Sequence, residues 1–250
     1  MDSSRPCLKS KIRSRFLLTR RKLLSTIAAV PPAWAAGGLF TRSSWSGEHE
    51  LTLAAGSLYY PLGGADAPLS KLWVYNGTTP GPEIRVRRGE RLRCNFKNQL
   101  EEASSIHWHG IRIINSMDGV SGLTQAAIEP GGEFLYEFEL PDAGTYWYHA
   151  HNRSWNQVGR GLYGPLIIEE EEPVFDRDHD LTLMIDDWLV DENSVLHTAS
   201  FGSLMHWSHA GRLGNWLTVN GKSLPGFSLN AGEHYRLRLI NASNARVLAI

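Results

Sequence analysis

Short stretches in which polar and apolar residues alternate dominate the chain from about residue 50 onward. Every second residue is apolar in Arg91–Lys97 and in Phe134–Leu140, and two further apolar runs occupy Thr145–His149 and Leu162–Ile168. A period of two places successive side chains on opposite faces of a β-strand, and glycines and prolines separate the runs. No segment of about 12 residues shows helical periodicity. The pattern therefore predicts an all-β protein, built as an antiparallel sandwich or barrel.

An acidic run, Glu169–Glu172, is followed by Pro173 and predicts a solvated boundary between two units. The first unit, residues 45–172, is long enough for one sandwich, since such domains usually have about 100–150 residues. After a linker at residues 173–180 the strand pattern restarts. Residues 181–250 are too few to cover both faces of a second sandwich, so we expect an incomplete second domain that continues beyond Ile250.

The first 35 residues have the features of an export signal. They contain eight Lys or Arg and one acidic residue, a weakly apolar run and the small-x-small site Ala33-Trp34-Ala35. Arg20-Arg21 before two leucines resembles a twin-arginine signal. We therefore predict a bacterial protein exported by the twin-arginine machinery to the periplasm or beyond, with a mature chain that starts near Ala36. A basic N-terminal arm is the alternative.

Composition excludes several classes of function. Beyond residue 35 the chain has 17 basic and 25 acidic residues, and nucleic acid is not a predicted partner because phosphate binding needs a basic patch. No stretch approaches the ~20 apolar residues of a membrane span. Two cysteines are too few for a disulfide scaffold or a Cys-rich metal module. Because Cys7 lies in the signal, Cys94 is predicted to be an unpaired core residue.

Two His-x-His pairs are the candidate metal ligands: His107 with His109, and His149 with His151. Residues i and i+2 of a strand share a face at a spacing of about 6.5–7 Å, so each pair can serve two neighbouring metal ions. Two such strands side by side would present four imidazoles. These ligands suit copper, zinc, iron or nickel, and the spacing does not choose among them. Chance surface pairs are disfavoured because four histidines in apolar strands would each need separate hydrogen-bond partners.

Several motifs surround these pairs at characteristic places: Asn76-Gly77, Pro80-Gly81-Pro82, Met117-Asp118-Gly119, Thr124-Gln125, Ile128–Gly131 and Gly161–Ile168. Together with the histidine pairs they resemble the N-terminal cupredoxin domain of multicopper oxidases, the family of laccases, bilirubin oxidases and bacterial cuprous oxidases. Val219–Lys222 and Arg236–Ala242 are similar to the start of that family's second domain. The resemblance implies a cupredoxin-like Greek-key β-sandwich, with one complete domain and the start of a second.

The same resemblance implies a role for each candidate residue. His107 would bind the type 2 copper, His109 and His149 would bind one type 3 copper, and His151 would bind the other. Asp118 would help to deliver protons to reduced oxygen, a role suited to a carboxylate. An ordinary Asp-Gly turn at this position is the alternative.

The resemblance also implies partners that this chain does not supply. Further cluster histidines and the type 1 copper ligands would follow Ile250, so the fragment alone should be inactive. The whole protein would couple one-electron oxidation of phenolic or aromatic substrates, or of metal ions, to reduction of dioxygen to water. The alternatives are a copper-binding or copper-tolerance protein of the periplasm, a non-catalytic relative of the cell-division type and, more distantly, a zinc hydrolase. His206 and His209 are candidates for an accessory copper site, although a solvated loop is the favoured interpretation.

Overall fold

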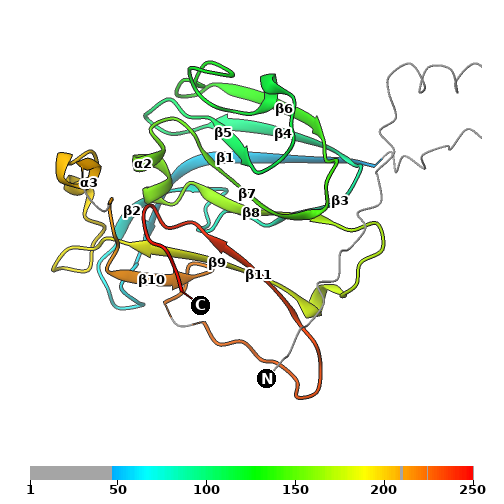
Figure 1. Ribbon diagram of the computed structural model, residues 1–250. Coiled ribbons are helices and arrows are strands. Elements are labelled where there is room, and N and C mark those ends of the chain that lie inside the picture. Colours follow the sequence, from blue (N-terminus) through cyan, green and yellow to red (C-terminus); the bar gives the residue numbers. More distant parts are fainter. Residues whose placement is uncertain (1–46, 209–210, 224, 250) are drawn as a thin grey trace, which may run out of the picture. The chain divides into compact units, whose positions relative to one another are not determined.

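The computed structural model describes residues 47–208, 211–223 and 225–249 (Figure 1). The predicted export signal, Cys7 and His209 lie outside the described residues. Residues Ser44–Ile250 form one compact unit, and its strands make three sheets. No described helix combines the length and the apolar character that crossing a bilayer requires.

Two four-stranded sheets form a sandwich. The first has the order β2-β1-β4-β6 and the second the order β3-β8-β7-β5. Their bounds are β1 (Glu48–Tyr60), β2 (Ser70–Tyr75), β3 (Ile84–Arg87), β4 (Arg91–Asn98), β5 (Ile106–His109), β6 (Glu133–Glu139), β7 (Gly144–Ala150) and β8 (Tyr163–Glu169). β1 pairs with β4, and β3 with β8, in parallel, while the other neighbours are antiparallel. These two parallel pairs depart from the antiparallel pairing predicted from the strand pattern, because the chain crosses to the other sheet between the paired strands.

The alternating segments fold as predicted. In β4 the side chains of Leu92, Cys94 and Phe96 are fully buried, whereas Arg93 and Asn95 between them are only partly buried. Cys94 is unpaired and buried, as expected, and burial raises the pKa of its thiol to about 12. Trp108 of β5 lies in the same core, with its ring 5.6 Å from that of Tyr136. The core therefore fixes β5 from its inner face.

A third sheet, with the order β10-β9-β11, follows the sandwich: β9 (Asp180–Trp188), β10 (Trp216–Val219) and β11 (Arg236–Asn241). Met184, Trp188 and Ile240 of this sheet share one buried cluster with Leu72 and Tyr163 of the sandwich. The short helices are η3 (Asn115–Met117), α2 (Ser154–Gln157), η4 (Val158–Arg160), η5 (Arg177–His179), η6 (Thr198–Ser200) and α3 (Leu204–Ser208). One face of the third sheet is thus covered by the sandwich. The domain boundaries at residues 172 and 181 stay predictions.

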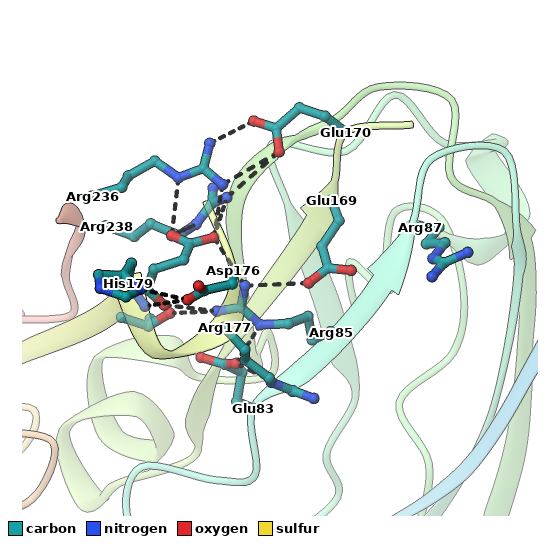
Figure 2. Close-up of polar contacts among 12 residues, drawn as sticks. Glu83, Arg85, Arg87, Glu169, Glu170, Asp176, Arg177, His179, Arg236 and Arg238 are labelled. Carbon is teal, nitrogen blue, oxygen red and sulfur yellow. Dashed lines mark hydrogen bonds and ion pairs between the residues drawn. The ribbon is translucent and has the colours of Figure 1, made fainter. Parts of the chain in front are cut away.

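The acidic run at the predicted boundary is partly ion-paired, so the interpretation of all four glutamates as a solvated segment is wrong. Glu169 is the last residue of β8, and its carboxylate lies 3.4 Å from Arg85. The Glu170 carboxylate accepts hydrogen bonds from Arg236 at 2.6 and 3.3 Å (Figure 2). Two of the four side chains therefore join strands that are distant in the sequence.

Asp180, the first residue of β9, is the centre of this network. Its carboxylate accepts hydrogen bonds from Arg85 at 3.0 Å, from Arg236 at 2.7 Å and from Arg238 at 2.7 Å. Burial raises the pKa of Asp180, but the three guanidinium groups outweigh it and hold the pKa well below its usual range. Arg238 also donates to Thr145 of β7 at 2.8 Å. The network therefore connects β3 and β7 of the sandwich with β9 and β11.

A second buried carboxyl group of β9, that of Asp186, predicts a pH dependence of stability. The Tyr163 hydroxyl donates a hydrogen bond to its carboxylate at 2.7 Å. Burial raises the pKa of Asp186 to about 7, whereas an unfolded Asp has a pKa of about 3.9. The folded chain therefore binds more protons between about pH 4 and pH 7, so the free energy of unfolding falls as the pH rises through this window.

We expect Asp186→Asn to flatten this slope, because an amide does not ionise. Denaturant unfolding at about pH 5 and about pH 8 measures the effect. Asp66→Asn, which changes an exposed side chain, is the control and should keep the wild-type slope. An equal slope in wild type and Asp186→Asn would contradict the prediction.

Candidate metal centre

The register of β5 and β7 places the candidate ligands on one face of the sheet. The two strands are antiparallel neighbours, with His107 opposite His149 and His109 opposite Trp147. Residues opposite one another share a face, and so do residues i and i+2. Ile106, Trp108 and Tyr148 point the other way and are fully buried. The same alternation that builds the core therefore collects the imidazoles on the opposite side.

The structure brings the four predicted histidines together. One nitrogen from each of His107, His109 and His149 lies within 4.8 Å of the others. His109 Nδ1 and His149 Nε2 are only 3.3 Å apart, close enough for both to contact one ion at a typical metal–nitrogen distance of about 2.0–2.1 Å. The His151 ring lies 5.1 Å from that of His107 and 5.8 Å from that of His149. It borders the group of three without joining it.

Hydrogen bonds to the backbone determine which ring nitrogens remain available. His107 Nδ1 lies 2.7 Å from the Asp118 carbonyl oxygen, and His149 Nδ1 lies 3.0 Å from the Ala150 carbonyl oxygen. A carbonyl oxygen only accepts, so Nδ1 carries the hydrogen in both rings and Nε2 keeps its lone pair. This arrangement is common among metal-binding histidines. The Asp118 carboxylate lies 3.4 Å from the same His107 nitrogen.

Burial favours the neutral form of two of these imidazoles, His109 and His149. His149 is 6% exposed, and burial lowers its pKa to about 3. Burial, together with the neighbouring His107 and His151, also lowers the pKa of His109. Neutral imidazole is the state that binds a metal ion. Three imidazole nitrogens in this arrangement fit copper, zinc, iron or nickel.

The four histidines line a cavity of about 620 Å³. Its other walls include Phe201, Arg212 and Asn244, and also His206. Arg212 is buried, stacks 4.0 Å from the Phe201 ring, and has a pKa that burial lowers to about 10. Sequence reasoning missed Phe201, Arg212 and Asn244, since they stand in no recognisable motif. The two interpretations of His206 and His209, a solvated loop and an accessory copper site, both stay predictions.

Comparison with known proteins identifies the family. The multicopper oxidase family model matches residues 61–173. Copper resistance protein A of Pseudomonas syringae pv. tomato is 42% identical over 165 residues, which are 66% of this chain and 26% of that protein. The crystal structure of a multi-copper oxidase from Pseudomonas thermotolerans superposes with a TM-score of 0.75 at 40% identity, covering 80% of this chain and 48% of that one. The matched segment, residues 61–173, belongs to the multicopper oxidase family.

Membership confirms the predicted family and fold class, an all-β cupredoxin-like sandwich. Another multicopper oxidase relative is Laccase-1 of Cryptococcus neoformans var. neoformans, 38% identical over 136 residues that cover 52% of this chain and 22% of that protein. The chain thus spans about a quarter of the length of these curated relatives. Membership implies copper as the cofactor.

Proposed function

We propose that the protein to which this chain belongs is a copper-dependent oxidase that passes electrons from a reducing substrate to dioxygen. The convergence of three imidazole nitrogens within 4.8 Å, in a segment of the multicopper oxidase family, carries this proposal. Copper ions held there would accept and release single electrons, chemistry that no side chain supplies. Phenolic or aromatic compounds and metal ions are the proposed electron donors.

Each of the four histidines has a separate proposed role as a copper ligand. His109 and His149 share one type 3 copper, which the 3.3 Å approach of their nitrogens supports. His107 holds the type 2 copper through Nε2, since Nδ1 faces Asp118. His151, beside but outside the group of three, holds the second type 3 copper. The type 1 copper and the remaining ligands belong to another part of the parent protein, so the 250-residue chain alone should not turn over.

Asp118 is the proposed proton donor. Its carboxylate is partly exposed, 26% of the side chain being accessible, and lies 3.4 Å from His107 Nδ1. It can therefore exchange protons with water, and it contacts the Nδ1 side of the proposed ligand His107. The Asp118–Gly119 segment is also a turn, with Gly119 at φ 81°, so the structural and catalytic interpretations are compatible.

Copper tolerance is the second candidate function, and the similarity to Copper resistance protein A favours it. In that case holding or oxidising copper ions would matter more than oxidising phenols. Under either function we propose twin-arginine export to the periplasm or beyond, on the sequence of the first 35 residues.

The test uses the full-length protein loaded with copper. We expect blue absorbance, and oxygen uptake that depends on a phenolic dye or on Cu(I). The ratio of the two rates distinguishes a laccase-like oxidase from a copper-tolerance protein. A copper-loaded protein with neither blue absorbance nor oxygen uptake would refute the oxidase proposal.

A further inference from the structure

We infer that Ser105 is a positioning residue of the metal centre: its hydroxyl anchors the Asp118–Gly119 turn, which holds the His107 ring with Nε2 free for a metal ion. The inference rests on the proposed role of His107 as a ligand. It assigns a function to a side chain that no metal ion would touch.

Ser105 is fully buried and immediately precedes β5, two residues before His107. Its Oγ donates a hydrogen bond to the Gly119 carbonyl oxygen at 2.7 Å. Ser105 Oγ also accepts a hydrogen bond from Ser121 Oγ, at 2.9 Å. The hydroxyl thus acts both as donor and as acceptor, and both of its partners lie in the segment that follows Asp118.

Two consecutive carbonyl groups of the turn contact β5 and the residue before it. The Asp118 carbonyl oxygen lies 2.7 Å from His107 Nδ1, and the next carbonyl, that of Gly119, is the one bound by Ser105. Gly119 has a φ of 81°, and a Cβ atom at this position would overlap the Ile106 carbonyl oxygen. The turn therefore packs backbone against backbone, a fit that only glycine allows. Ser105 is the side chain of the strand segment that ties down this turn next to the His107 contact.

The position of the Asp118 carbonyl decides the chemistry of the ring. A neutral imidazole has one N–H and one lone pair, and the hydrogen bond from Nδ1–H leaves the lone pair on Nε2. If the turn shifted, this preference would weaken and rings with the hydrogen on Nε2, which cannot bind a metal ion through that nitrogen, would accumulate. Loss of such supporting hydrogen bonds typically weakens metal binding by about 10–100-fold.

The experiment compares Ser105→Ala with Ser104→Ala in the 250-residue chain. Ser104 is the adjacent residue, equally buried, and its hydroxyl donates to Gln157 at 2.8 Å instead of to the turn. Nitrogen-15 NMR of the metal-free chain at about pH 8, well above the ordinary histidine pKa of about 6.5, reports the tautomer of His107. We expect the Nδ1–H form in wild type and in Ser104→Ala, and a mixture in Ser105→Ala. Copper titration should show about 10–100-fold weaker binding in Ser105→Ala alone.

Ser105→Cys, which retains a weaker donor of similar shape, is the second variant and should change the tautomer less. The inference is wrong if a folded Ser105→Ala, or Ser105→Cys where the alanine variant does not fold, keeps both the wild-type tautomer and the wild-type copper affinity. His107→Ala separates this outcome from failure of the proposed function. Unchanged copper affinity in His107→Ala would refute the ligand role of His107. If His107→Ala binds copper more weakly but the Ser105 variants behave like the wild type, only the role of Ser105 is refuted.

Discussion

Replacing His107 and His109 together with alanine should remove copper from the cluster and leave the sandwich folded. The change deletes two of the three imidazoles whose nitrogens meet within 4.8 Å. Loss of a supporting hydrogen bond already weakens metal binding by about 10–100-fold, so the loss of two direct ligands should exceed about 100-fold. The fold should persist, because β5 is held by the fully buried side chains of Ile106 and Trp108 on the opposite face.

The measurement is the copper content of the purified full-length protein, together with a thermal or denaturant unfolding curve. His49→Ala with His234→Ala is the matched control, since it removes two imidazoles that lie outside the cavity. This control should retain the wild-type copper content. Wild-type copper content in the double variant at positions 107 and 109 would contradict the ligand assignment.

The sequence was sufficient to predict the strands and the shared face of each histidine pair, because both depend on the same local rule. Alternation places Leu92, Cys94 and Phe96 in the core, and it equally places His107 and His109 on the face opposite Trp108. That β5 and β7 are neighbours does not follow from the alternation. The prediction of one shared site depended on the resemblance to a family, and the ligand roles stay predictions.

Contacts between distant segments could not be predicted in this way. Phe201 and Arg212 reach the cavity from a stretch without regular alternation, and nothing in their local sequence indicates which wall they form. The acidic run gave a misleading signal for the same reason. A row of glutamates is usually solvated, yet Glu170 meets Arg236, a partner 66 residues away that only the tertiary fold supplies.

Among the single substitutions proposed for the described residues, Asp180→Ala should lower the free energy of unfolding the most. The side chain of Arg238 is only 5% exposed, and without Asp180 its nearest carboxylate is Glu170, at 4.0 Å. Removing one partner of a buried ion pair typically costs about 3–5 kcal/mol, because the remaining charge stays buried without compensation. Arg85 and Arg236 should contribute less. Arg85 keeps Glu83 at 2.8 Å and Glu169 at 3.4 Å, and Arg236 is 23% exposed and keeps Glu170.

Denaturant unfolding at about pH 7 tests this expectation, with Asp178→Ala as the control. Asp178 is an exposed carboxylate two residues away, so its loss should change the free energy of unfolding by less than about 0.5 kcal/mol.

The difference in the free energy of unfolding between wild type and Asp180→Ala should also depend on pH. The folded pKa of Asp180 lies below its usual range, so its stabilisation is present above the unfolded pKa of about 3.9 and is lost as the pH falls towards the folded value. A loss below about 1 kcal/mol at neutral pH, the range of an exposed ion pair, would mean that water screens these guanidinium groups and that the buried network does not hold the third sheet against the sandwich.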